Sequence, residues 1–127
     1  MYKDLYRTDP EFMERFEHFA FDEVVNEPGQ QLEPRTRYMA ILASLLGCGG
    51  VEAFKYMLYS ALDAGVSPVD AKEIVYQAVD YLGIGRVLPF LNITNKVLED
   101  KGVELPLQGQ GTTTLENRLE KGAQAQA

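Results

Sequence analysis

The chain has few of the residues from which metal and redox sites are built. Its 127 residues include no tryptophan, one cysteine (Cys48) and one histidine (His18). A single cysteine cannot form a disulfide within the chain, so we expect a protein of the reducing cytoplasm. One histidine and one cysteine, distant in sequence, supply too few ligands for a metal site, and no glycine-rich phosphate loop follows a strand. We therefore expect no metal and no cofactor.

Positive charge and long apolar runs are also scarce. The chain has twelve Lys and Arg residues and nineteen Asp and Glu residues, so its net charge is -7. The basic residues form no cluster in the sequence. Because phosphate groups attract clustered positive charge, we expect no nucleic-acid partner and no anionic membrane surface as a partner. No apolar run approaches the length of a membrane span, and the N-terminal residues mix charges with aromatics. We therefore predict neither a membrane helix nor a signal peptide.

What the sequence does contain is helical periodicity along most of its length. Hydrophobic residues make up 46 % of the chain, enough for one globular domain without disulfides. Apolar residues recur three and four positions apart, and no segment shows a convincing strand pattern. We predict an all-α fold, an antiparallel bundle of helical hairpins with five to six helices over 8–25, 32–47, 51–65, 66–83, 84–102 and 115–127.

Proline, glycine and small polar residues mark the predicted helix ends. Asp9 before Pro10, and Ser67 before Pro68, are typical of a helix N-terminus, where the missing proline N–H costs nothing. Gly47, like Gly65 and Gly102, is expected to end a helix. We expect Pro89 to fall within the first turn of its helix, where it need not break the helix. Thr113 and Glu116 have the spacing of a capping box and predict the start of a C-terminal helix. The first helix presents an apolar stripe of Phe12, Phe16 and Phe19.

Three segments follow from this pattern. We predict an N-terminal helix and turn over 1–31, a helical domain over 32–102, and a linker with a C-terminal helix over 103–127. The sequence "NRLEKG" at 117–122 weakly repeats "ERFEHF" at 14–19. The C-terminal segment is thus either the start of a second repeat, an interaction arm, or simply an amphipathic helix.

Several short motifs, taken in order, resemble one known family. They are an L-x-P-x-T-R start, an A-L-x-x-G-[VA]-[ST] turn, an early E-I pair and a later Y-x-G, formed here by Leu32, Pro34, Thr36, Arg37, Ala61, Leu62, Gly65, Val66, Ser67, Glu73, Ile74, Tyr81 and Gly83. From 32 to 101 the chain resembles the carboxymuconolactone decarboxylase family, whose fold is shared with alkylhydroperoxidase D-like proteins. The resemblance implies an all-α fold whose hairpins assemble into trimers or hexamers.

The resemblance also shows what this sequence has lost. Its peroxidase-like branch carries C-x-x-C followed by a histidine, and these positions fall on Gly50, Ala53 and Met57. The decarboxylase-like branch tends to have histidine at the position of Met57 and another near Gln77. A dithiol cycle needs one attacking and one resolving thiol, so Cys48 alone cannot complete it.

Seven residues remain as candidates for a site. For catalysis we consider Glu52 and Tyr56, with Cys48 as a reactive thiol near a helix N-terminus or as a plain small residue. For substrate binding we consider two arginines, whose planar groups match a carboxylate, together with an amide and a phenol: Arg37, Arg86, Gln77 and Tyr81. Each charged residue among them has an ordinary alternative as a solvated surface charge. Tyr56 and Tyr59 lie off the apolar stripe of their helix and favour a subunit contact.

Two kinds of function fit these observations. The first is a cofactor-free lyase of the carboxymuconolactone decarboxylase type, acting on a small carboxylated lactone or related acid, with Arg37 or Arg86 holding the carboxylate and Glu52 or a tyrosine moving protons. The second is a non-catalytic oligomeric module for binding or assembly. Alkylhydroperoxidase-type antioxidant activity is the weakest interpretation, because both motif cysteines are absent.

Overall fold

The computed structural model describes residues 3–127, and this part of the chain contains helices and no strand. The all-α prediction is therefore confirmed. The elements are α1 (Lys3–Thr8), α2 (Pro10–His18), a π-helical turn η1 (Phe19–Glu23), α3 (Pro34–Cys48), α4 (Val51–Asp63), α5 (Pro68–Leu82), α6 (Ile84–Asp100) and α7 (Arg118–Gln126). The seven α-helices of residues 3–127 exceed the five to six predicted, because α1 precedes the first predicted helix, which was expected over 8–25.

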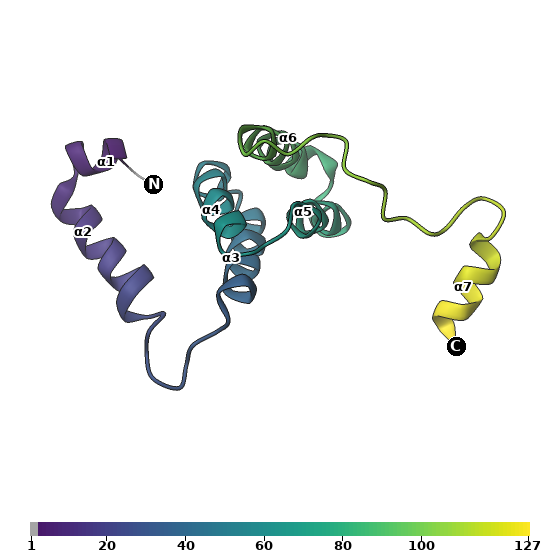
Figure 1. The fold of residues 1–127 in the computed structure, drawn as a ribbon, viewed down its shortest axis with the longest axis horizontal. Helices are drawn as coiled ribbons and strands as arrows, with labels where there is room; N and C mark the ends of the chain where they lie inside the picture. Colours follow the sequence, from purple (N-terminus) through teal and green to yellow (C-terminus); the bar gives the residue numbers. More distant parts are fainter. Residues whose placement is uncertain (1–2) are drawn as a thin grey trace.

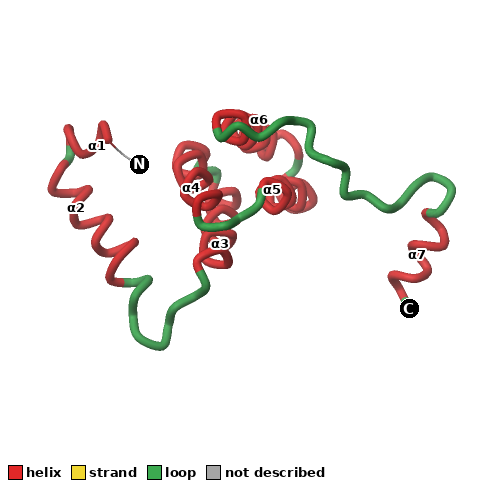
Figure 2. Tube along the Cα trace, in the orientation of Figure 1, coloured by secondary structure: helices red, strands yellow, loops and turns green. Residues whose placement is uncertain are grey.

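Four of the helices form the body of the molecule. The hairpin α3–α4 packs on the hairpin α5–α6, with α3 against α5 and α4 against α6, so that each helix contacts two others. Figure 1 shows α1 and α2 on one side of this bundle and α7 on the other, at the end of an extended linker. The tube in Figure 2 shows that the linker between α6 and α7 has no regular secondary structure. The protein is thus a compact bundle with two arms.

The bundle is held together by large apolar side chains from all four helices. Leu42, Phe54, Leu58, Val75 and Val97 are fully buried. The rings of Phe54 on α4 and Phe90 on α6 meet edge to face, with centroids 5.1 Å apart and planes at 88°. Burial of side chains of this size supplies most of the stabilisation of such a domain. The contact also fixes how one hairpin lies on the other.

The turn between α3 and α4 differs from the prediction. Gly47 was expected to end α3, but the helix continues through Cys48. Gly49 then adopts the left-handed conformation, with φ of 76°, and its N–H donates to the Leu46 carbonyl. Because L-residues avoid this conformation, the turn needs a glycine at 49. Gly47 is left as an ordinary helical residue on the surface of α3.

Pro89 also lies further into its helix than we predicted. It belongs to the second turn of α6, and the helix continues to Asp100. Proline has no N–H to donate to the carbonyl four residues earlier, which is that of Gly85. Gly85 is exposed, so water can bond to its carbonyl.

One carboxylate links the starts of α3 and α5. The side chains and backbones of Ser67 and Asp70 form a capping box, with the Asp70 N–H donating to Ser67 Oγ at 3.0 Å. Arg35 Nη2 donates to Asp70 Oδ2 at 2.8 Å, and Ser67 Oγ donates to the same oxygen at 2.8 Å. The hydrogen bond from Ser67, followed by that from Arg35, lowers the pKa of Asp70 below its ordinary value. The N-cap of α3 is Glu33, whose carboxylate accepts from the backbone of Arg35 and Thr36.

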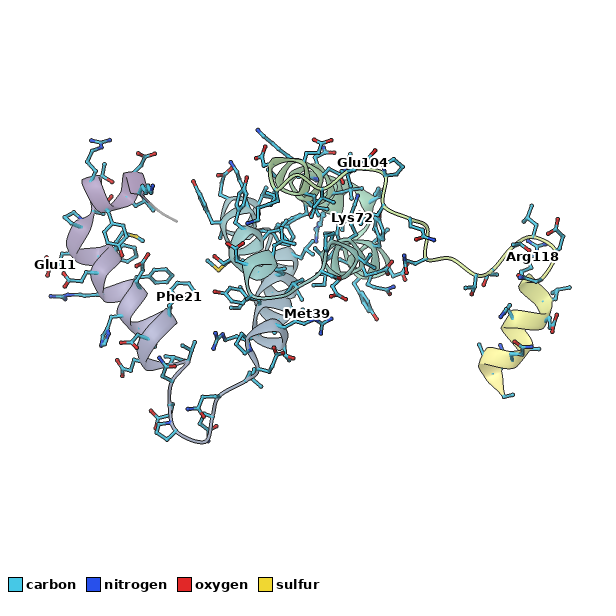
Figure 3. The ribbon with its side chains drawn as sticks, in the orientation of Figure 1. Glu11, Phe21, Met39, Lys72, Glu104 and Arg118 are labelled. Atoms are coloured by element: carbon cyan, nitrogen blue, oxygen red, sulfur yellow. The ribbon has the colours of Figure 1, made fainter. Side chains whose placement is uncertain are left out.

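The N-terminal arm does not bury the stripe that its sequence suggested. Phe12, Phe16 and Phe19 are all exposed, with 65 % of Phe12 accessible to solvent. Asp9 occupies the N-cap position of α2, but its side chain makes no capping hydrogen bond. Figure 3 shows Phe21 on the side of the arm that faces the bundle, where it packs on the core.

The C-terminal arm is even less packed. No residue of α7 is buried, and Leu115 and Leu119 are exposed. The helix start is stabilised one residue later than predicted: Thr114 and Asn117, rather than Thr113 and Glu116, exchange hydrogen bonds between side chain and backbone. The predicted helix is present, but it has no partner surface on its own bundle.

The charge of Asp70 gives the first testable prediction. Asp70→Asn should lower the free energy of unfolding by about 1 kcal/mol at pH 7, because its hydrogen bonds from Arg35 and Ser67 lose their ionic character. The folded-state pKa lies below the ordinary value of 3.8. The stabilisation is therefore full above that value and is lost as the pH falls through the folded-state pKa.

Denaturant unfolding of both proteins between pH 7 and pH 2 measures this difference. Asp80→Asn, an exposed acid on the same helix, is the matched control and should change stability little. A difference between Asp70→Asn and the parent protein that persisted unchanged at pH 2 would contradict the assignment.

Candidate functional site

An apolar groove runs between α3 and α5. Its volume is about 490 Å³. Figure 3 labels Met39 on α3, and this side chain is one of those that line the groove. Its lining is Met39, Ala43, Leu46, Gly47, Asp70, Glu73, Ile74, Gln77, Ala78, Tyr81 and Leu82. We call this surface the α3/α5 groove.

The groove exists because small residues stand where two helices meet. Ala43 and Gly47 on α3, and Ala78 on α5, leave the space between the helices unfilled. A methyl group added at Gly47 would meet no atom within 4 Å. The floor is apolar and open, a shape that suits an organic ligand or a helix.

The polar residues of the groove are two acids, one amide and one phenol: Asp70, Glu73, Gln77 and Tyr81. Asp70 is held by Arg35, and the Gln77 amide donates to a Glu73 carboxylate oxygen at 3.4 Å. None of the described residues that line the groove is basic. Because Arg35 already neutralises Asp70, Glu73 is the one lining carboxylate without a cation, and its charge repels an anionic ligand and attracts a positive one. The electrostatics therefore disfavour a free organic acid in this groove.

A second hollow, of about 610 Å³, lies under the linker. It is bounded by α5, α6 and residues 105–111. Lys72, its central cation, donates to the Asn95 side chain and lies 5.6 Å from the centre of the Tyr76 ring. Lys72 is thus engaged by its neighbours on α5 and α6. The hollow is the space that the linker leaves where it crosses these helices.

The structure brings together only part of the residues predicted for a site. Gln77 and Tyr81 both line the α3/α5 groove, and 88 % of Tyr81 is exposed. Glu73 joins them, although the sequence analysis had not placed it in the site. The spacing 73, 77 and 81 was the available signal, because residues four apart share one face of a helix.

The remaining candidates lie elsewhere. Arg37 is in the first turn of α3, 5.8 Å from the centre of the Tyr38 ring, while Glu52 is exposed in the first turn of α4. Because α4 begins where α3 ends, these two residues stand at opposite ends of the hairpin. Arg86 is exposed in the first turn of α6. None of the three lines the α3/α5 groove.

Tyr56 and Tyr59 border a small hollow of about 310 Å³ on α4. The Tyr59 hydroxyl donates to Asp100 of α6 at 2.7 Å, and this hydrogen bond raises the pKa of Tyr59. Tyr59 thus contributes to contacts within its own chain. Lys55 lies 5.9 Å from the centre of the Tyr56 ring.

Cys48 is the last residue of α3 and is exposed. Its Sγ lies 3.5 Å from the Leu45 carbonyl oxygen, to which the thiol donates. The thiol therefore faces the carbonyl end of α3. Its Sγ also lies beside the N-cap of α4, since a Cβ added at Gly50 would stand 3.5 Å from it. The interpretation as a reactive thiol near a helix N-terminus stays a prediction.

Met57 lies at the position where the family resemblance implies a histidine. Only 4 % of this residue is exposed, and it packs in the core beside Leu58 and Ala61. The two positions that correspond to the thiol pair are Gly50, the N-cap of α4, and Ala53. A titratable group is absent from all three positions.

Two packed helical hairpins with a groove between them place the chain in the class of all-α hairpin-bundle proteins. A family model described as "Carboxymuconolactone decarboxylase family" matches residues 10–96. The chain therefore belongs to the carboxymuconolactone decarboxylase family, as its motifs had indicated. The match includes α2 and reaches into α6, so it extends beyond the segment of resemblance at its N-terminal end. Searches of curated proteins and of solved structures found no significant match.

Residues 3–127 lack a membrane-spanning helix and a cluster of metal ligands. No helix in this range is both long enough and apolar enough to cross a membrane. The same range contains no group of three or more His, Cys, Asp or Glu side chains placed to hold a metal ion.

The position of Cys48 generates the second prediction. A thiol reagent such as 5,5′-dithiobis(2-nitrobenzoic acid) should modify one thiol per chain in the native protein, because Cys48 is exposed. Cys48→Ser should unfold at the same denaturant concentration as the parent protein, since the side chain packs in no core. A native protein whose thiol reacted only after unfolding would overturn this placement.

Proposed function

We propose that this chain is a binding and assembly module of the carboxymuconolactone decarboxylase family that has lost the chemistry of its relatives. The observation that carries the proposal is Met57, which fills the histidine position with a buried thioether. General acid–base catalysis needs a titratable group within hydrogen-bond reach of the substrate, and a thioether cannot supply one. The lone, exposed Cys48 supports a cytoplasmic location and excludes a dithiol cycle within one chain.

Exposed apolar surface on the arms supports self-assembly. Apolar side chains that cluster on the surface of a soluble protein mark interaction sites. On the N-terminal arm, Phe12 and Phe16 stack with ring centroids 6.1 Å apart, and Leu5, Tyr6 and Phe19 are exposed with them. Burial of these groups against further copies of the chain would remove them from water. A trimer or hexamer, as the family resemblance implies, would provide such partners.

A second candidate is a cofactor-free lyase for a small carboxylated lactone or related acid. The size of the α3/α5 groove supports it, because the volume lies in the range of small-molecule sites and Glu73, Gln77 and Tyr81 converge there, whereas the charge of Glu73 opposes a carboxylate. In that case Glu73 would move protons. Arg37 or Arg86 would hold the carboxylate only if another subunit brought it to the groove.

An activity assay separates the two functions and gives the third prediction. Purified protein incubated with carboxymuconolactone should release no carbon dioxide above the buffer rate, because the histidine position is filled by Met57. Release of carbon dioxide that Glu73→Gln reduced by about a hundredfold or more would establish the lyase instead. Gln77→Ala, which leaves the carboxylate in place, is the matched variant.

The fourth prediction concerns the oligomer. Light scattering on the purified chain should give a mass that is a multiple of 14.2 kDa. Phe12→Ser combined with Phe16→Ser should shift the mass toward the monomer without loss of the bundle, because both side chains lie outside its core. A parent protein of 14.2 kDa at micromolar concentration would refute self-assembly.

A further inference from the structure

We propose that helix α7 of one copy docks in the α3/α5 groove of a second copy. This inference rests on the proposed assembly function and names the surfaces that carry it. The groove offers an apolar floor, and α7 offers an apolar stripe that is unused on its own chain.

The acceptor surface suits a helix with small residues. Its floor contains Ala43, Gly47 and Ala78, so a helix placed on it can approach α3 and α5 closely. Met39, Leu46 and Ile74 are available to surround an inserted leucine. A helix laid here would complete a layer beside α3 and α5.

Helix α7 has the matching pattern. Leu119 is 84 % exposed, and Leu115 in the preceding turn is 83 % exposed. Gly122 and Ala123 follow Leu119 by three and four residues, so one face of α7 carries large residues first and small ones after. The large side chains of α7 would lie opposite the small residues of the groove floor. Its small residues would lie where α7 comes closest to α3 and α5, so that the side chains interdigitate.

Charge favours α7 over the other arm as the occupant. At the rim of the groove Asp70 is paired with Arg35, whereas Glu73 accepts only from the neutral Gln77 amide and has no lining cation. Arg118 flanks Leu119 on α7 and can supply the missing positive charge. By contrast, α2 carries Glu11, Glu14 and Glu17. Its acids and its phenylalanine rings suit neither the rim nor the small floor.

The course of the linker favours a second copy over the same chain. Residues 105–111 line the hollow on α5 and α6, which leaves the six residues 112–117 as the tether, spanning roughly 20 Å at full extension. Figure 1 shows that this tether carries α7 away from its own α3 and α5. If two copies exchange their α7 helices, each helix fills the groove of the other copy, and the two copies are related by one twofold axis.

Disulfide cross-linking tests the contact, and the single native cysteine makes the experiment clean. Two proteins are made in the Cys48→Ser background, one with Ala43→Cys and the other with Leu119→Cys, and are mixed under mild oxidation. We expect a disulfide-linked heterodimer on a non-reducing gel. The matched control pairs Ala43→Cys with Lys121→Cys, which lies on the opposite face of α7 and should cross-link at least about tenfold less.

The outcomes separate the possible occupants. A chain carrying both Ala43→Cys and Leu119→Cys that formed only an internal disulfide would assign the groove to its own α7 and overturn the proposal. Equal cross-linking of the Leu119→Cys and Lys121→Cys proteins would also overturn it, because no defined face of α7 would then be docked. Heterodimer formation specific to Leu119→Cys supports it.

Charge reversal provides an independent readout. Arg118→Glu should raise the dissociation constant of the oligomer by about tenfold, and adding Glu73→Arg should restore most of that loss. Unchanged mass and affinity for Arg118→Glu and for Leu119→Asp in an otherwise oligomeric protein would reject α7 docking alone. A monomeric parent protein would instead reject the assembly function on which the inference rests.

Discussion

The edge-to-face packing of Phe54 against Phe90 is the contact on which the rest of the structure depends. It joins α4 to α6 and so fixes one hairpin on the other. Once Phe54 faces inward, Met57 and Leu58, one turn further on, must face the core as well. In this chain, the position at which the family resemblance implies a histidine is therefore part of the buried core. The same rotation of α4 directs Glu52 toward solvent.

The bundle could be predicted from the sequence because its helices carry their own boundary signals. Ser67 before Pro68 places the start of α5, and the apolar periodicity of α4 matches its buried face. Periodicity shows which residues share a face, but not what that face meets. Phe12 and Phe16 follow the expected spacing and yet lie in solvent. Likewise, a glycine permits a helix end without requiring one, as Gly47 illustrates.

Of the candidate residues named from the sequence, only those that share one helix lie together in the α3/α5 groove. Gln77 and Tyr81 both lie on α5, and the neighbouring Glu73 could have been added by the same four-residue spacing. Residues on different helices depend on packing that a linear sequence does not encode directly. Arg37 and Glu52 are fifteen positions apart. Arg37 lies at the start of α3, and Glu52 follows the Gly49 turn at its end, so most of the length of α3 lies between them.

The two arms leave the bundle on opposite sides, as Figures 1 and 2 show. Under the proposed self-assembly, each chain would contact other copies through two surfaces, one on each arm. The angle between successive contacts then decides whether association closes into a ring or continues as an open filament. The tether before α7 allows that angle to vary. The N-terminal arm, by contrast, packs on the core through Phe21. The N-terminal arm would thus decide whether the proposed oligomer closes into a ring. The C-terminal arm would let the ring form even when its symmetry is imperfect.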